Sequence, residues 1–373
     1  MGLRRNGRVV IVGGGPAAAA AAVALRGHGH EGTIEMLCAE STAPYSRPPL
    51  SKTLLRGEVD ASDLALDVAD AEVHTSARAV RVDFDARSVE LAHGERRPYD
   101  GLVIATGTAA RRPSDPTIEV LQTIEDAVRI APRLRAARSV LVVGSGFLAH
   151  ELASAARTQG AETSLVVRPR ALARRIGPML AELIEARAAQ AGVRLVESAG
   201  GDFRDGGFTT AAGERLDADL VLAAIGSKAR SFDTTGAPAS RSEAYVVDQH
   251  CRLRDGVVVA GDAAVVRTPD GRLRSDRSWM SALAQGAAAA RGLLDDDAPV
   301  PATVSYAWTE AYGLEVKISG TPPIGESPVV LDGDLSDGRA LLQWPGGAAA
   351  AGYRIPTPRL RALASATSAT PGS

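Results

Sequence analysis

The chain has 373 residues, of which 45 % are hydrophobic, and its 42 basic and 44 acidic side chains give a formal net charge of −2. This length allows two or three domains that each bury a core, and the balanced charge favours neither nucleic acid nor a membrane surface as a partner. No apolar run is long enough to predict a helix that spans a bilayer.

The first predicted elements form a β–α–β unit. An apolar strand over 8–12 leads into the turn Gly13-Gly14-Gly15 and an alanine-rich helix over 17–26, and an acid follows a second strand over 33–38. In such units the turn lets a pyrophosphate approach the backbone at a helix start, and the acid binds a ribose. A strand–helix turn without a ligand is the alternative. The residues expected at the dinucleotide are Gly13, Gly15, Pro16, Ala17 and Glu40.

A proline-braced segment, residues 44–52, follows this unit. Its three prolines restrict the backbone on both sides of Arg47 and Lys52, so both side chains are expected to be held in place. The chain contains three lysines in all, which sets Lys52 apart from an incidental surface charge.

A second unit with the same order of elements begins at residue 139. It has a strand over 139–143, the turn Gly144-Ser145-Gly146, a helix over 147–158 and a strand over 163–167. Two such units are much less expected by chance than one, so both are assigned to dinucleotides. Buried strands ending near residues 107 and 226 are expected to complete the two sites. The residues predicted there are Thr106, Gly107, Gly144, Gly146, Phe147, Leu148 and Gly226.

The end of the strand over 163–167 carries a hint of nucleotide specificity. An acid at this place would bind the ribose hydroxyls of NADH, but Val167 stands there, followed by Arg168, Pro169 and Arg170. A 2′-phosphate favours arginine and repels a carboxylate, so NADPH is predicted in preference to NADH. Solvated arginines on a loop are the competing explanation.

Later elements indicate how the domains are ordered. An apolar strand over 257–259 leads to Gly261 and Asp262, and a helix over 279–294 follows. We expect an α/β fold of two Rossmann-like dinucleotide-binding domains, the first interrupted by the second, plus a small α+β C-terminal domain. Residues 362–373 are small and polar and are expected to fray. The expected ranges are 1–113 with 237–298, 114–236, 299–365, and a flexible tail over 366–373.

These motifs together resemble the FAD-dependent NAD(P)H:ferredoxin reductases of oxygenase and P450 systems, the putidaredoxin reductase-like lineage. The resemblance covers roughly residues 8–320 and is specific at 44–52 and 261–262. It implies FAD and NAD(P)H as cofactors and a fold shared with disulfide reductases but without a redox disulfide. It places Lys52 beside the flavin, paired with Glu151, and Asp262 at the ribityl chain. Further residues that it implies at the cofactors are Arg47, Ala79, Trp279 and Trp308, although Trp308 could equally be a core tryptophan.

The function implied by the resemblance is transfer of hydride from NAD(P)H to FAD and of electrons onward to a small iron–sulfur ferredoxin, of the [2Fe–2S] or another type. Three departures from the family pattern, at Gln122, Ala229-Arg230 and Arg277, favour an alternative: a flavoenzyme acting directly on a small molecule in a specialised pathway. A third hypothesis is a nucleotide-binding signalling protein. A homodimer is left open.

The cysteines and histidines predict no further chemistry. Cys38 and Cys251 have no partner at metal or redox spacing, so no metal and no vicinal redox disulfide are expected, and Cys38 is predicted to pack in a strand. His150 is the histidine with a possible approach to the cofactor, and the other histidines are expected to be solvated. With no leader recognised at the first strand, the expected location is the cytoplasm.

Overall fold

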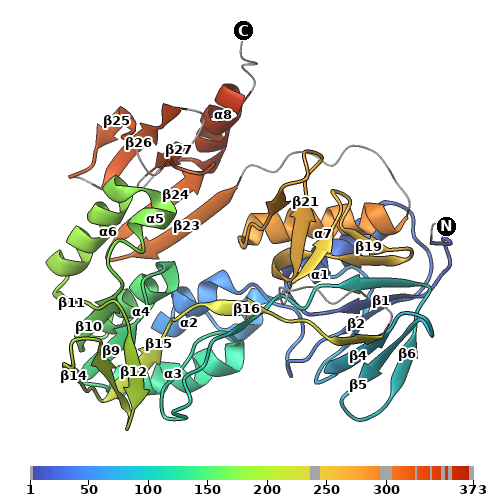
Figure 1. Ribbon diagram of the computed structural model, residues 1–373, viewed down its shortest axis with the longest axis horizontal. Coiled ribbons are helices and arrows are strands. Elements are labelled where there is room, and N and C mark those ends of the chain that lie inside the picture. Colours follow the sequence, from blue (N-terminus) through green and yellow to red (C-terminus); the bar gives the residue numbers. More distant parts are fainter. Residues whose placement is uncertain are drawn as a thin grey trace. The chain divides into compact units, whose positions relative to one another are not determined.

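The computed structural model describes residues 3–235, 244–294, 305–323, 326–336, 338–345, 349–351 and 355–368. It divides into two compact units, which can be followed by colour in Figure 1. Unit 1 consists of Met1–Arg47, Ser62–Ala109 and Lys228–Thr303, and unit 2 of Pro48–Ala61, Ala110–Ser227 and Val304–Ser373. The chain leaves unit 1 and returns to it, as the sequence predicts for an interrupted first domain.

Unit 1 is built around a six-stranded sheet whose strands are parallel except for one antiparallel edge pair. Every residue of its four inner strands is buried, as expected when both faces of a parallel sheet are covered. In order across the sheet, the strands are β19 (Arg252–Arg254), β20 (Val257–Val259), β7 (Gly101–Ile104), β1 (Val9–Val12), β2 (Ile34–Leu37) and β3 (Glu72–His74).

Two helices, α1 (Pro16–Gly27) and α7 (Trp279–Leu293), lie side by side on one face of this sheet (Figure 1). Their contact is lined with alanines, and a Cβ added at Gly286 would meet the carbonyl oxygen of Ala17 at 2.3 Å. Small side chains therefore let the helices approach closely, and this approach brings their N-terminal ends to the same edge of the sheet, where the parallel strands end.

Smaller antiparallel and mixed sheets cover the opposite face of the unit 1 sheet. Their apolar side chains share a core with Val10, Val12 and Ile104. One sheet contains β17 (Asp233–Thr235), β4 (Ala79–Asp83), β5 (Ser88–Leu91) and β6 (Arg96–Pro98), and the other β18 (Tyr245–Val247), β21 (Ala264–Arg267) and β22 (Leu273–Arg274).

Unit 2 contains a second parallel sheet, of four strands. Helix α3 (Ile124–Ala136) begins with a capping box between Thr123 and Asp126, so its start is fixed by local chemistry. The sheet strands are β11 (Val193–Glu197), β10 (Glu162–Val167), β9 (Ser139–Val143) and β15 (Leu220–Ala223). Other elements are α4 (Phe147–Thr158), α5 (Ala173–Ile176), α6 (Pro178–Gln190), β12 (Gly201–Arg204), β13 (Gly207–Thr210) and β14 (Arg215–Leu216).

Most of the proline-braced segment and the residues after it belong to unit 2, because Pro48–Ala61 clusters there. This stretch forms η1 (Pro48–Ser51), α2 (Thr53–Arg56) and the start of η2 (Ala61–Leu64). A two-stranded ribbon of β8 (Thr108–Ala110) and β16 (Ser227–Ala229) marks where the chain passes between the units. The domain boundaries near residues 113, 236 and 298 stay predictions.

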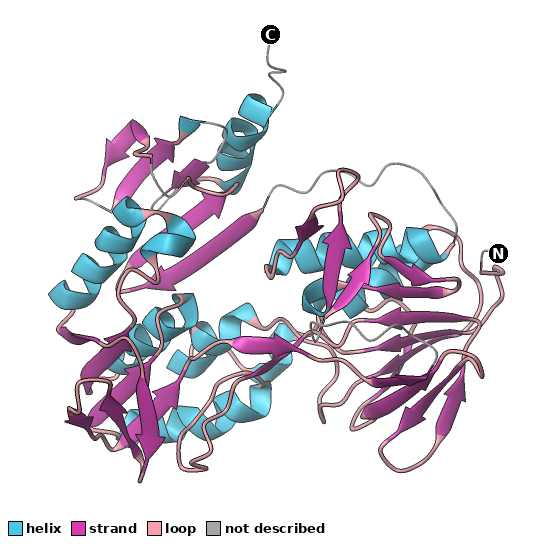
Figure 2. Ribbon diagram, in the orientation of Figure 1, coloured by secondary structure: helices cyan, strands magenta, loops and turns pink. Residues whose placement is uncertain are grey.

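The C-terminal part of unit 2 is a five-stranded antiparallel sheet with a helix, the α+β region that the sequence predicts (Figure 2). Its strands, in order, are β23 (Tyr306–Ala311), β24 (Leu314–Ser319), β27 (Ala349–Ala351), β26 (Arg339–Gln343) and β25 (Val329–Asp334). The helix, α8 (Thr357–Ser368), corrects the expectation of a frayed chain for residues 362–368, and the rest of the expected tail, 369–373, lies outside the described residues. Pro358 in the first turn and the alanines after it favour helix over their small, polar composition.

The predicted fold class is confirmed: both units contain a parallel α/β sheet with a helix crossing from the first strand to the second. Within the described part of the chain, no helix has the length and apolar character needed to cross a membrane.

Candidate functional site

The first glycine turn lies between the end of β1 and the start of α1. Gly13 has a φ of +138°, and a Cβ there would meet the carbonyl oxygen of Ala105 at 2.2 Å, so the turn requires glycine. Gly15 is the N-cap of α1, and a Cβ built on it meets nothing within 4 Å. The first turn of α1, with Pro16 and Ala17, therefore begins beside open space, which suits an anionic phosphate.

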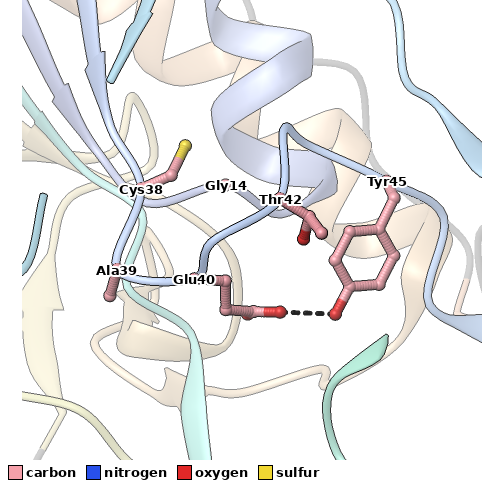
Figure 3. Close-up of a pocket in the computed structure, with 6 residues that line it drawn as sticks. All are labelled: Gly14, Cys38, Ala39, Glu40, Thr42 and Tyr45. Atoms are coloured by element: carbon pink, nitrogen blue, oxygen red, sulfur yellow. Dashed lines mark hydrogen bonds between the residues drawn. The ribbon is translucent and has the colours of Figure 1, made fainter. Parts of the chain in front are cut away.

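A small pocket lies beside this turn, lined by Gly14, Cys38, Ala39, Glu40, Thr42 and Tyr45 (Figure 3). The buried hydroxyl oxygen of Thr42 has no hydrogen-bond partner among the described residues. Burial, reinforced by the Glu40 carboxylate, raises the pKa of the Cys38 thiol to about 11, so this buried thiol is protonated near neutral pH. The pocket thus combines a carboxylate and a hydroxyl, the groups that bind sugar hydroxyls, with an unreactive cysteine.

The Glu40 carboxylate is held by two donors from the proline-braced segment. The Tyr45 hydroxyl donates to Oε2 at 2.5 Å (Figure 3), and the Arg47 guanidinium donates to Oε1 at 2.5 Å. The guanidinium also lies 5.2 Å from the centre of the Tyr45 ring. Arg47 therefore binds the predicted ribose-binding acid, Glu40. Tyr45 is a further residue of this pocket, and the sequence motif did not predict its role.

Asp262 lies at the carboxyl end of β20, in the short helix η3 (Gly261–Ala263). Gly261 has a φ of +73°, and a Cβ there would lie 3.0 Å from the Cβ of Ala17, so this strand end adjoins the start of α1. Burial raises the pKa of Asp262 to about 6, although the charges of Arg277 and Arg47 act in the opposite direction. The carboxyl is thus partly desolvated and placed to accept hydrogen bonds at the same edge as the glycine turn.

In the ligand-free protein, Asp262→Asn should increase the free energy of unfolding at pH 7. A carboxyl whose pKa rises from 3.8 to about 6 on folding holds its proton more tightly in the folded state, so stability falls as the pH rises between these values. The shift corresponds to roughly 3 kcal/mol at most. Urea unfolding should show a gain of roughly 1–3 kcal/mol for the variant at pH 7, shrinking toward pH 4. An equal gain at both pH values would contradict this origin.

The second glycine turn repeats the geometry of the first in unit 2. Gly144 has a φ of +156°, and a Cβ there would meet the carbonyl oxygen of Ala224 at 2.4 Å. Gly146 is the N-cap of α4, and a Cβ on it meets nothing within 4 Å. Phe147 and Leu148 form the first turn of this helix. The N-terminus of α4 therefore also lies beside open space.

The loop after β10 gathers positive charge next to this turn. The backbone N–H of Arg168 donates to the Ser145 hydroxyl at 2.7 Å, which ties the loop to the glycine turn. Arg168 and Arg170 are exposed, and Arg170 has a φ of +56°. Arg174 donates to the carbonyl oxygen of Pro169 at 3.2 Å, and the Arg175 guanidinium lies 5.5 Å from the centre of the Phe147 ring. Two exposed arginines, Arg168 and Arg170, thus follow directly after the place where an NADH-binding acid would stand.

The predicted ion pair between Lys52 and Glu151 is present inside unit 2. The Lys52 ammonium lies 2.8 Å from Glu151 Oε1, and the two side chains are 9 % and 6 % exposed. The Trp308 ring centre is 5.7 Å from the ammonium, so the tryptophan lies at this pair as well. In a buried pair of this kind, the attraction between the two charges offsets part of the cost of removing both groups from water.

The other predicted residues lie in loops, at a strand start or at a helix start. The Thr106 hydroxyl donates to the carbonyl oxygen of Arg230 at 2.8 Å, and Gly107 and Gly226 have left-handed φ values of +64° and +96°. Trp279 is the first residue of α7 and is half-buried, and Ala79 begins β4. The cofactor contacts assigned to these residues stay predictions.

His28 and His93 are exposed as expected, but other histidines are not. His30 and His250 are buried rather than solvated, at 2 % and 8 % exposure. His150 is fully buried, and desolvation lowers its pKa to about 4, so its ring is neutral. Its Nδ1 lies 3.4 Å from the Tyr312 hydroxyl, which places it in the packing between α4 and the β23–β24 turn. Helix periodicity around Glu151 could have indicated burial of His150, whereas His30 and His250 sit in loops without such a signal.

Three hydroxyl residues of the sites were not identified from sequence. Ser51 and Thr309 both donate to the Glu151 carboxylate, and Thr42 faces the Glu40 pocket. Ser51 and Thr309 adjoin motif residues in the chain, but a serine or threonine beside a motif is common. Among the described residues, no group of three or more His, Cys, Asp or Glu side chains could hold a metal ion.

Comparison with known proteins adds independent information. Residues 7–289 match the family model described as pyridine nucleotide-disulphide oxidoreductase. The chain is 31 % identical to the ferredoxin reductase component of chlorobenzene dioxygenase from Cupriavidus sp. (strain PS12), covering 90 % of this chain and 85 % of that protein. It is also 31 % identical to rhodocoxin reductase from Rhodococcus erythropolis, over 86 % of this chain and 80 % of that one. Putidaredoxin reductase in its covalent complex with putidaredoxin superposes with a TM-score of 0.83 at 25 % identity, covering 97 % of this chain and 93 % of that chain.

Proposed function

The chain belongs to the pyridine nucleotide-disulphide oxidoreductase family, and we propose that it is an FAD-dependent NAD(P)H oxidoreductase that passes electrons to a small ferredoxin. Relatives named as reductases of ferredoxin and rhodocoxin support this assignment. The lack of a Cys-x-x-Cys or Cys-x4-Cys pair in the sequence argues against a vicinal-dithiol disulfide reductase. The observation that carries the proposal is the buried pair of Lys52 and Glu151 in a unit that also holds a dinucleotide turn.

The residues of unit 1 fit FAD. The open space at the Gly15 N-cap suits a pyrophosphate, the Glu40 pocket with its unpartnered Thr42 hydroxyl suits a ribose, and the buried Asp262 carboxyl suits a sugar-like chain. When bound, FAD would supply the redox chemistry, in which a hydride is accepted and electrons are released one at a time. The chain would bind and orient it, exclude water, and hold the Lys52 ammonium at a fixed place.

We propose NADPH as the preferred donor. The support is the exposed Arg168 and Arg170 beside the second glycine turn, in a loop where Val167 takes the place of an acid. A 2′-phosphate gains charge-assisted hydrogen bonds from such guanidinium groups. The acceptor is proposed to be a [2Fe–2S] or similar ferredoxin.

Stopped-flow spectroscopy tests this function. The purified protein should carry FAD, be reduced rapidly by NADPH, and then reduce one member of a panel of ferredoxins. Rapid reduction without transfer to any ferredoxin, combined with turnover of a metabolite or of oxygen, would favour direct action on a small molecule. Material that stays colourless after incubation with FAD would rule out the flavoprotein assignment.

Gly15→Ala separates cofactor binding from folding. A Cβ at Gly15 has no neighbour within 4 Å and the residue has an ordinary φ of −99°, so the variant should fold with stability within about 1 kcal/mol of the parent. Its methyl group would stand in the space assigned to the pyrophosphate, so the ratio of FAD to protein should fall at least several-fold. Gly13→Ala is the contrasting variant, since its Cβ clashes with the Ala105 carbonyl and should impair folding itself. Unchanged FAD content in Gly15→Ala would contradict the placement.

A further inference from the structure

Three side chains from two separate segments of unit 2 converge on the Glu151 carboxylate. Oε1 forms an ion pair with the Lys52 ammonium at 2.8 Å and accepts a hydrogen bond from the Thr309 hydroxyl at 2.9 Å. Oε2 accepts from the Ser51 hydroxyl at 2.5 Å. Lys52 and Ser51 belong to the segment around η1, whereas Thr309 comes from β23 of the C-terminal sheet. A carboxylate that is 6 % exposed depends on such donors, because water reaches it poorly.

The two hydroxyls are themselves fixed by their surroundings. Thr309 is 1 % exposed, and its backbone is paired with Val316 in the β23–β24 ladder. Its branched side chain has few rotamers, so the ladder determines where its hydroxyl points. Ser51 ends η1 and is 6 % exposed. An ionised carboxylate can only accept hydrogen bonds, so both hydroxyls must donate to it.

The Lys52 ammonium is confined by the same arrangement. Besides Glu151 it lies 3.4 Å from the carbonyl oxygen of Pro48 and 5.7 Å from the centre of the Trp308 ring. Its position therefore depends on where the Glu151 carboxylate is held.

We propose that Thr309 and Ser51 are positioning residues that hold the Glu151 carboxylate and thereby the Lys52 ammonium in one place. This inference rests on the proposed function, in which Lys52 acts at the flavin. Through Thr309, the C-terminal sheet contributes to the reductive site of this chain, although Thr309 itself acts through Glu151 and not on a cofactor.

Chemical labelling of the lysines of the FAD-bound protein tests the positioning directly. The chain has three lysines, so brief acylation with acetic anhydride followed by mass spectrometry reports on each of them. Thr309→Val removes the hydroxyl and keeps the shape, whereas Thr309→Ser keeps the hydroxyl. Labelling of Lys52 should rise about fivefold in Thr309→Val and stay at the parent level in Thr309→Ser.

The other two lysines are internal controls. Lys317 lies opposite Trp308 in the β23–β24 ladder, so general loosening of the C-terminal sheet would raise its labelling too. Lys228 is exposed and reports the reagent dose. A rise confined to Lys52 supports the proposal. A rise shared with Lys317, or no rise at all, overturns it. Labelling needs neither nicotinamide nor acceptor, so it remains interpretable if the FAD-bound protein does not pass electrons from NAD(P)H to a ferredoxin.

Stopped-flow kinetics give a second readout. Thr309→Val should slow flavin reduction about tenfold and leave the apparent Kd for the nicotinamide donor unchanged, and Thr309→Ser should restore the rate. Ser51→Ala should act in the same direction, and the double variant should lose less than the product of the two effects, because both hydroxyls serve one carboxylate. Equal damage from Thr309→Val and Thr309→Ser, or strictly multiplicative effects, would refute positioning through Glu151.

Discussion

Glu151→Leu should lower the free energy of unfolding by about 3–5 kcal/mol, the range observed when one member of a buried ion pair is removed. The substitution leaves the Lys52 ammonium, which is 9 % exposed, without its counter-charge. It also removes the acceptor of the Ser51 and Thr309 hydroxyls. Urea unfolding of the purified parent and variant measures the loss, provided that the free energy of unfolding depends on urea concentration with the same slope in both. A change below about 1 kcal/mol would mean that the pair is effectively solvated.

The double variant Lys52→Met/Glu151→Leu is the matched control. Replacing both charges by apolar side chains of similar size removes the unpaired ammonium, so stability should recover by about 1–3 kcal/mol relative to Glu151→Leu. Recovery should be incomplete, since each of the two hydroxyls left without an acceptor costs about 1–3 kcal/mol. The double variant should nevertheless reduce its flavin slowly, which would separate the contribution of the pair to stability from its contribution to the reaction.

The dinucleotide turns could be predicted from the sequence, whereas the end of α8 could not. The dinucleotide turns were predictable because an apolar strand, a glycine turn and an alanine-rich helix form a local pattern whose geometry depends on few residues. Gly13 and Gly144 illustrate this, since their close approach to the carbonyls of Ala105 and Ala224 leaves no room for another residue. The end of α8 was not predictable in this way, because a tail of alanine, serine and threonine is compatible with either helix or coil.

In the candidate site, too, some contacts could be predicted from sequence motifs and others could not. The pairing of Lys52 with Glu151 followed from the family resemblance, because both residues lie in recognisable motifs. The role of Thr309 could not follow from sequence, since it depends on the β23 register that brings one hydroxyl to a helix 158 residues earlier in the chain. Tyr45 and Thr42 depend likewise on how a loop folds over Glu40. Contacts between distant segments are fixed by packing and not by local pattern.

Arg168→Glu should lower kcat/KM for NADPH about 100-fold and change kcat/KM for NADH less than about threefold. A charge-assisted hydrogen bond to a phosphate is lost and replaced by repulsion, whereas NADH offers no phosphate at this position. The loop itself should survive, because its tie to the glycine turn uses the backbone N–H of Arg168, which the variant retains. Steady-state kinetics with both nucleotides measure the ratio, and equal losses would eliminate Arg168 as the source of specificity.

Arg138→Glu is the appropriate charge-matched control for this experiment. Its side chain is 93 % exposed, and it precedes β9 at the end of the sheet opposite the glycine turn. Five strand residues separate the two ends, a distance of roughly 16 Å, beyond the screening length of physiological salt. The control therefore changes the net charge by the same amount without reaching the nucleotide. If Arg138→Glu shifted the NADPH-to-NADH ratio as much as Arg168→Glu, long-range attraction, and not a local 2′-phosphate contact, would explain the preference.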